Sequence, residues 1–339
     1  MPDFTTLTDL AAERLGGAVL LANDEFFAPK ENLLKAAPAV WREGEYTDRG
    51  KWMDGWETRR RRESGHDWCI IRLGAPGIVR GVVVDTAFFR GNYPEHCSIE
   101  ATDRHVADDA QHLAAPTTRW VPILPKSALQ GDAKNPFAVD SPERWTYLRL
   151  NIFPDGGVAR LRVHGDVVPD WTRVLTGGGW VDLAAIEHGG RVIAQSDAFF
   201  GNANNMLLPG RSTHMGDGWE TKRRRGGGHD WAVVRLGRPG AIHRVELDTD
   251  HFKGNAPGSA SLEARRAGAD ATALDDAGWT PLLAQSKIQP HARHVFDDLA
   301  HPGEVTHVRI NIFPDGGVAR LRLCGTVTGS AGSPTASGG

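Results

Sequence analysis

The chain has 339 residues, a length that predicts two domains rather than one core. Its 39 basic and 42 acidic residues give a net charge of −3, which argues against a global field that attracts nucleic acid or an anionic membrane. No apolar run approaches the roughly 20 residues of a membrane span, and no export signal is recognisable. Three cysteines without metal-ligand spacing, Cys69, Cys97 and Cys324, favour a reducing, cytoplasmic location.

Most of the chain is an internal duplication. The phrase NIFPDGGVARLR at residues 151–162 returns unchanged at 311–322, and 23 of the 39 positions from Asp54 to Asn92 are identical to those 163 residues later. The offset between the copies falls from 173 to 163 to 160, so the first copy has ten extra residues between Asp24 and Asp54. This insertion, within residues 35–52, suits a lid or a subunit contact, but a plain surface loop is the simpler expectation.

The predicted elements are mostly short strands. A short helix is expected near residues 8–15, and strands are expected at 67–74 and 81–89, where Gly and Pro bound apolar runs. Residues 146–153 alternate apolar and polar side chains, PDGG follows, and residues 158–163 resume the alternation, which predicts a β-hairpin. The second copy repeats these patterns. We therefore predict an all-β protein with one antiparallel sandwich per copy.

The repeat boundaries predict four segments. The first repeat covers residues 9–168, a linker covers 169–181, and the second repeat covers 182–327. Residues 328–339 are small and polar with nothing to bury, so we expect a disordered tail.

Several charged and polar residues are identical in both copies although packing does not require them. The candidates for catalysis are Glu57, His66, Asp67, Glu220, His229 and Asp230. The candidates for binding are Arg60, Asn92, Asp155, Arg160, Arg223, Asn255, Asp315 and Arg320.

Each motif also has a structural interpretation. Adjacent His and Asp side chains in a strand face opposite ways, so GHDW can equally supply a buried His and a capping Asp. The Asp of FPDGG can cap its own turn, although Gly-Gly also lets a ligand approach the backbone. The arginine run is weak support for nucleic-acid binding in an acidic chain. The spacing of the His and acidic residues leaves the presence of metal ligands open.

Together, DGWETRRRR…GHDW, FFRGNYPEHCSIEA and NIFPDGGVARLR in tandem copies resemble the allantoicase family, from about Asp9 to Val327. The resemblance implies that each repeat is a jelly-roll sandwich similar to galactose-binding and discoidin-type modules. It also implies a hydrolase of linear amidines that converts allantoate to ureidoglycolate and urea in purine (allantoin) degradation. The tail beyond Thr328 and the exact loop lengths depart from the family pattern.

Allantoate has one carboxylate and two ureido groups, so its site needs an anion clamp, acceptors for N–H groups and an acid for the departing nitrogen. We expect Arg60 or Arg160, or their counterparts, to hold the carboxylate, and Asp155 or Asp315 to accept ureido N–H groups. Glu57, His66 and their counterparts are then candidates for proton transfer. No cofactor is specified, and a divalent metal stays open.

Two further questions stay open at this level. The duplication allows an active site in each copy, an active site in one copy with a degenerate site in the other, or one composite site formed by both copies. The insertion favours sites that differ between the copies. The chain could alternatively be a non-catalytic β-sandwich that binds a small ligand, or an amidohydrolase that releases ammonia at a dinuclear metal site. The expected partners are a small-molecule substrate and further copies of the chain in a homo-oligomer, because sandwich edges are exposed.

Overall fold

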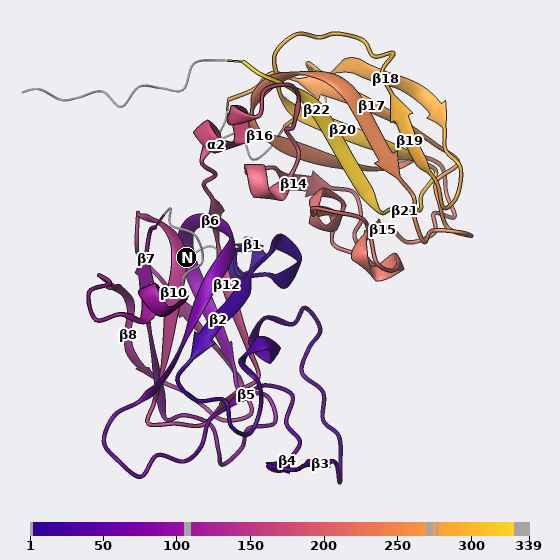
Figure 1. Cartoon of the computed structure of the whole chain (residues 1–339). Helices are drawn as coiled ribbons and strands as arrows, with labels where there is room; N and C mark the ends of the chain where they lie inside the picture. The colour runs from indigo at the N-terminus through magenta and orange to yellow at the C-terminus, as the bar shows by residue number, and fades with distance from the viewer. Residues whose placement is uncertain (1–2, 105–109, 269–273, 276, 329–339) are drawn as a thin grey trace, which may run out of the picture. The chain divides into compact units, whose positions relative to one another are not determined.

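The computed structural model describes residues 3–104, 110–268, 274–275 and 277–328 (Figure 1). The chain forms two compact units, Met1–Pro169 and Asp170–Gly339. Each unit is built mainly of strands that form one eight-stranded sheet. The prediction of an all-β fold with two related domains is confirmed.

The first unit is organised around one very long strand, β6. The strand order is β1-β12-β6-β10-β7-β8, and β2 and β9 also pair with β6. The first part of β6, residues 67–78, pairs with β10, and residues 77–85 pair with β12, so β6 takes part in both layers of the sandwich. The sheet contains β1 (Thr8–Asp9), β2 (Ala18–Ala22), β6 (Asp67–Asp85), β7 (His96–Thr102), β8 (Val121–Ala128), β9 (Lys134–Ala138), β10 (Arg144–Phe153) and β12 (Arg160–Val167).

The second unit repeats this topology strand for strand. Its order is β13-β22-β16-β20-β17-β18, with β14 and β19 also on the long strand β16. Register is kept as well, because Asp230 faces Ile312 as Asp67 faces Ile152. The sheet contains β13 (Val181–Asp182), β14 (Arg191–Gln195), β16 (Asp230–Asp248), β17 (Ser259–Arg265), β18 (Thr280–Lys287), β19 (Arg293–Phe296), β20 (Val305–Phe313) and β22 (Arg320–Val327).

The core of each unit is made by the alternation seen in the sequence. Leu148, Leu150 and Ile152 of β10 and Leu161 and Val163 of β12 are fully buried. Each such side chain contributes about 1.5–3 kcal/mol by leaving water. The second unit buries the matching side chains Val308, Ile310, Ile312, Leu321 and Leu323.

The predicted hairpin around PDGG is wrong. Strand β10 pairs with β6 and β7, whereas β12 pairs with β6 and β1, so the two strands do not pair with each other. Residues 154–159 connect them and contain β11 (Gly157–Val158), which pairs with β5 (Trp56–Glu57). In the second unit β21 (Gly317–Val318) pairs with β15 (Trp219–Glu220) in the same way. Pairing with the long strand β6 therefore overrides the local turn signal.

Helices are short throughout the described residues. The helix expected near residues 8–15 is strand β1 followed by the 3-10 helix η2, because Asp9 pairs with β12 and accepts the N–H of Val163. None of the described helices is long and apolar enough to span a membrane. They are α1 (Ala110–Ala114), α2 (Trp171–Thr176), η1 (Phe4–Thr6), η2 (Glu13–Leu15), η3 (Lys30–Leu34), η4 (Ile186–His188), η5 (Ala203–Leu207) and η6 (Met215–Asp217).

The expected linker, residues 169–181, begins where the two units divide and contains α2. Of the expected tail, only Thr328 is among the described residues, and 329–339 lie outside them.

Candidate active site

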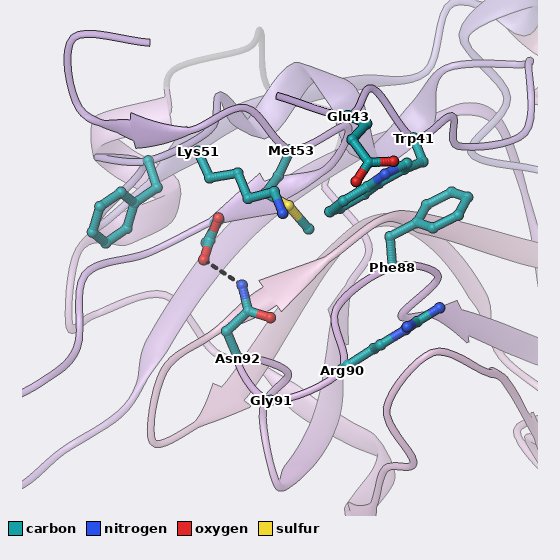
Figure 2. A pocket seen from close by; sticks show the side chains of 10 residues that line it. Trp41, Glu43, Lys51, Met53, Phe88, Arg90, Gly91 and Asn92 are labelled. Atoms are coloured by element: carbon teal, nitrogen blue, oxygen red, sulfur yellow. Dashed lines mark hydrogen bonds between the residues drawn. The ribbon is translucent and has the colours of Figure 1, made fainter. Parts of the chain in front are cut away.

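A cavity of about 670 Å³ in the first unit joins two of the candidate site residues with others that the sequence analysis did not single out (Figure 2). Glu57 and Asn92 are the two candidates. The lining consists of Phe27, Trp41, Glu43, Lys51, Met53, Glu57, Phe88, Arg90, Gly91 and Asn92.

Glu57 and Asn92 form a hydrogen-bonded pair in the wall of this cavity. The Asn92 Nδ2 atom donates to Glu57 Oε1 at 2.7 Å, and Glu57 is only 9% exposed. Glu57 is held by β5, whose backbone pairs with Gly157 of β11 and with Ala28. The carbonyl of Asn92 in turn accepts the Gly157 N–H at 2.8 Å. The repeated turn thus positions both side chains.

The Gly-Gly of PDGG is explained by this close approach. A Cβ on Gly157 would lie 1.9 Å from the ring of Phe89, and one on Gly156 would lie 2.7 Å from the carbonyl oxygen of Asn92. Gly156 also has a φ of +138°, which L side chains rarely adopt. These glycines therefore let the turn pack against the loop that carries Asn92.

Burial makes Glu57 a weaker acid than an exposed glutamate. Desolvation of its carboxylate raises the pKa of Glu57 above the ordinary value, and the hydrogen bond from Asn92 opposes this shift only in part. A carboxyl group with a raised pKa keeps its proton closer to neutral pH. Glu57 is therefore suited to act as a general acid.

The cavity also holds two cations, Lys51 and Arg90. Arg90 pairs with Asp132, with Nε and Oδ2 3.0 Å apart. Lys51 Nζ lies 4.1 Å from the centre of the Trp41 ring, and no carboxylate of the described residues pairs with it. Lys51 is therefore placed to receive an anionic group of a ligand.

The insertion of the first repeat, which adds ten residues, forms part of the wall. The Val40 N–H donates to Asp54 Oδ2 at 3.0 Å, as the Thr213 N–H does to Asp217 Oδ2 at 3.1 Å. Residues 40 and 213 are 173 apart but the two aspartates are 163 apart, so residues 41–53 replace the three residues 214–216, and we call residues 41–53 the insertion. It contains β3 (Tyr46–Thr47) and β4 (Gly50–Lys51), and it supplies Trp41 and Glu43 to the cavity. It is a cavity wall rather than a plain surface loop.

The second unit keeps the acid–amide pair in different surroundings. Asn255 Nδ2 donates to Glu220 Oε1 at 2.5 Å. Residues 41–53 are replaced by the three residues 214–216, and the positions of Phe88 and Arg90 are occupied by His251 and Lys253. The two repeats are therefore inequivalent around the shared pair.

Arg160 and Arg320 are used within the protein. Arg160 is 2% exposed, and its guanidinium donates to Asp54 Oδ2 at 2.8 Å and to the carbonyls of Ala37, Asp54 and Ala159. Arg320 makes the same contacts with Asp217 at 3.1 Å and with neighbouring carbonyls. In this arrangement they brace the chain on either side of the insertion point.

The aspartates that both repeats share also have protein partners. Asp155 Oδ2 accepts the Arg61 N–H at 2.8 Å, and Asp315 accepts the Arg224 N–H at 2.8 Å. Asp67 is buried and accepts from Asn23 and Arg61, and Asp230 accepts from Ser196 and Arg224. These bonds tie residues 58–67 and 221–230 to the PDGG turns.

The remaining candidates lie away from the cavity lining. His66 packs against the ring of Phe153 at 4.6 Å, and His229 packs against Phe313 at 4.5 Å. Arg60 and Arg223 are exposed.

No metal-binding cluster is found in the part of the chain that the structure describes, where three or more His, Cys, Asp or Glu side chains would have to converge. The three cysteines are unpaired. Burial raises the pKa of the Cys97 thiol to about 12 and that of Cys324 to about 11, so both stay protonated near neutral pH.

The fold and the cavity define a class: a duplicated all-β protein in which one repeat carries an elaborated acid–amide pocket. A family model described as the allantoicase repeat matches residues 8–168 and 181–328. The chain belongs to the allantoicase family.

Relatives and a solved structure agree with this assignment. A protein of Burkholderia pseudomallei named probable allantoicase 2 is 50% identical over 329 residues, which cover 96% of each chain. The allantoicase of Dictyostelium discoideum is 48% identical over 322 residues, covering 93% of this chain and 86% of that one. The crystal structure of allantoicase from Saccharomyces cerevisiae matches with a TM-score of 0.78 at 37% identity, covering 95% of this chain and 93% of that one.

Proposed function

We propose that this chain is an allantoicase, which hydrolyses allantoate to ureidoglycolate and urea, and that the reaction takes place in the cavity beside Glu57. The location of the active site is proposed from one observation: the buried Glu57–Asn92 pair lines a cavity that Lys51 also lines. The activity is supported by identity of 48–50% to named allantoicases over nearly the whole chain.

The cavity offers a partner for each part of the substrate. The carboxylate of allantoate pairs with Lys51, which takes the clamp role expected of Arg60 or Arg160. One ureido group lies at the Glu57–Asn92 pair, where the Glu57 carboxyl faces the nitrogen that leaves. Asn92 keeps Glu57 in place through its 2.7 Å hydrogen bond.

The reaction breaks the bond between the central carbon and one ureido nitrogen. The oxygen of a water molecule becomes bonded to that carbon as a hydroxyl group, and the departing nitrogen gains a proton from Glu57. The proton that the water releases restores Glu57, so that urea and ureidoglycolate result. Water can displace urea directly, or it can add after urea has left an imine. Both routes need a proton at the departing nitrogen, and Glu57 supplies it.

We also propose that there is one active site per chain, in the first repeat. Glu220 and Asn255 then serve the fold of the second repeat, since the second repeat has only three residues, 214–216, where the first has the insertion with Trp41 and Lys51. In the same way, His66, Asp67, Asp155 and Arg160 act as structural residues, as do their counterparts in the second repeat.

A cytoplasmic location and self-association complete the proposal. The unpaired cysteines suit a reducing compartment. Exposed aromatic side chains on the second unit, Phe199 and Phe200, support a homo-oligomer, because large exposed apolar groups often mark contact surfaces.

The activity is tested by incubating the protein with allantoate. We expect one urea and one ureidoglycolate per substrate consumed. Ammonia as the first nitrogen product would support an amidohydrolase, and binding of allantoate without turnover would support the non-catalytic alternative. A parallel incubation with a chelator measures whether a divalent metal is needed.

The raised pKa of Glu57 gives a pH prediction. The protonated form is active, so kcat/KM should be at its plateau below the pKa of Glu57 in the folded protein and fall as the pH rises through it. Because burial raises this pKa, kcat/KM should begin to fall at a pH above the ordinary pKa of a glutamate. The measurement is kcat/KM against pH at constant ionic strength. An increase of kcat/KM with pH that depends on Glu57 would mean that Glu57 acts as a base.

A further inference from the structure

We infer that the insertion, residues 41–53, selects the substrate, and that Trp41 is the platform on which the second ureido group of allantoate stacks. This inference rests on the proposed function. It gives a specificity role to a segment that only the first repeat possesses.

Trp41 lines the cavity with part of its ring exposed, and the ring contacts both Phe88 and Lys51. Trp41 is 40% exposed, which is high for a tryptophan. The ring of Phe88 supports it, with ring centres 5.9 Å apart and an angle of 34° between the planes. Figure 2 shows Trp41 and Phe88 together on one side of the pocket and Asn92 with its hydrogen-bond partner on the other.

The position of Lys51 links Trp41 to the carboxylate of the substrate. Lys51 Nζ lies 4.1 Å from the centre of the Trp41 ring, so a carboxylate bound at Lys51 lies beside that ring. In allantoate both ureido groups and the carboxylate are attached to one carbon. With one ureido group at Glu57–Asn92 and the carboxylate at Lys51, the other planar ureido group falls on the side of Trp41, where flat groups stack favourably.

The second repeat shows what the pocket lacks without the insertion. Phe199 and Phe200, the counterparts of Phe26 and Phe27, are 64% and 60% exposed, whereas Phe26 is 38% exposed. In the first repeat, Arg49 of the insertion covers Phe26 with its guanidinium, 5.4 Å from the ring centre. The second repeat therefore keeps an acid–amide pair without the Trp41–Phe88 pair, which agrees with the proposed active site in the first repeat.

The test is the kinetics of Trp41→Ala with allantoate. Trp41 contacts a group that does not react, so we expect KM to rise about tenfold while kcat changes less than about threefold. Trp41→Phe should restore most of the loss, because it keeps a flat ring. Tyr46→Ala is the matched control, since Tyr46 belongs to the same insertion but is 70% exposed and is not among the cavity residues. Tyr46→Ala should leave both constants unchanged.

A single-armed ligand separates the two ureido positions. Hydantoate has one ureido group and a carboxylate, so it should inhibit by occupying Glu57–Asn92 and Lys51. Trp41→Ala should raise its inhibition constant by less than it raises the KM for allantoate, because hydantoate loses only the support that Trp41 gives to Lys51. If Trp41→Ala weakened the binding of hydantoate and allantoate equally, the second ureido group would not stack on Trp41 and the inference would be wrong. It would also be wrong if Tyr46→Ala raised KM as much as Trp41→Ala. If Trp41→Ala had a normal KM while Glu57→Gln lost activity, only this inference would be contradicted. If the wild-type protein released no urea, the proposed function itself would be contradicted.

Discussion

Replacing Glu57 with Gln is expected to lower kcat for urea release by about 10²–10⁴-fold, the usual effect of removing a general acid. Gln keeps the size of the side chain, and its amide oxygen can still accept the 2.7 Å hydrogen bond from Asn92. It cannot deliver a proton to the departing nitrogen. The measurement is kcat for urea release from allantoate.

The matched control is Glu220→Gln, which changes the same pair in the second repeat. This variant should retain activity within about threefold of wild type, because Glu220 lacks the surrounding pocket. Equal halving of activity by the two substitutions would mean two equivalent sites and would contradict a single site in the first repeat.

Loss of folding should not explain the inactive variant. The pKa of Glu57 is raised in the folded protein, so the stability that its carboxyl contributes is present below the unfolded pKa and is lost as the pH rises through the folded pKa. Above that pH the charged, buried carboxylate destabilises the folded protein, and the neutral Gln side chain removes this cost. Glu57→Gln should therefore unfold at a temperature no lower than wild type at pH values above this range.

Replacing Arg160 with Ala is expected to lower the free energy of unfolding by about 3–5 kcal/mol, because it removes the buried partner of the Asp54 carboxylate and leaves it only the half-exposed Lys35, 3.6 Å away, and the Val40 N–H. Denaturation by guanidinium chloride measures this loss without adding urea, which is the expected product. Arg80→Ala is the control, because Arg80 makes an exposed salt bridge with Asp166 at 2.8 Å that should contribute only about 0–1 kcal/mol.

The same variant decides between two roles for Arg160. A structural brace predicts the large loss of stability. Wild-type stability together with a strongly raised KM would instead make Arg160 the substrate clamp that the sequence suggested.

The fold class could be predicted from the sequence because the pattern that indicates a strand lies within a few consecutive residues. The alternation of Leu148, Leu150 and Ile152 and its repetition in the second copy indicate strands and two related domains without reference to distant residues. The pairing of those strands is not local. PDGG indicates a hairpin by its turn chemistry, yet the partner of each flanking strand is β6, far away in the sequence.

The sequence singled out only part of the candidate cavity, for a related reason. Polar identity between the repeats picked out Glu57 and Asn92, but it also picked out Arg160 and Asp67, whose contacts maintain the common fold. The same criterion could not find Trp41 or Lys51. Both lie in the insertion, and residues 214–216 of the second copy contain neither Trp nor Lys, so neither residue is shared by the two copies. The asymmetry of the repeat was the signal that pointed to this wall.

The most direct test of the account is a crystal structure of Glu57→Gln with allantoate bound. We expect allantoate in the cavity of the first unit. Its carboxylate should contact Lys51, and one ureido group should contact Asn92 and the glutamine that replaces Glu57. Ligand bound at Glu220 and Asn255, or at Arg60 or His66, with the cavity left without allantoate, would contradict it.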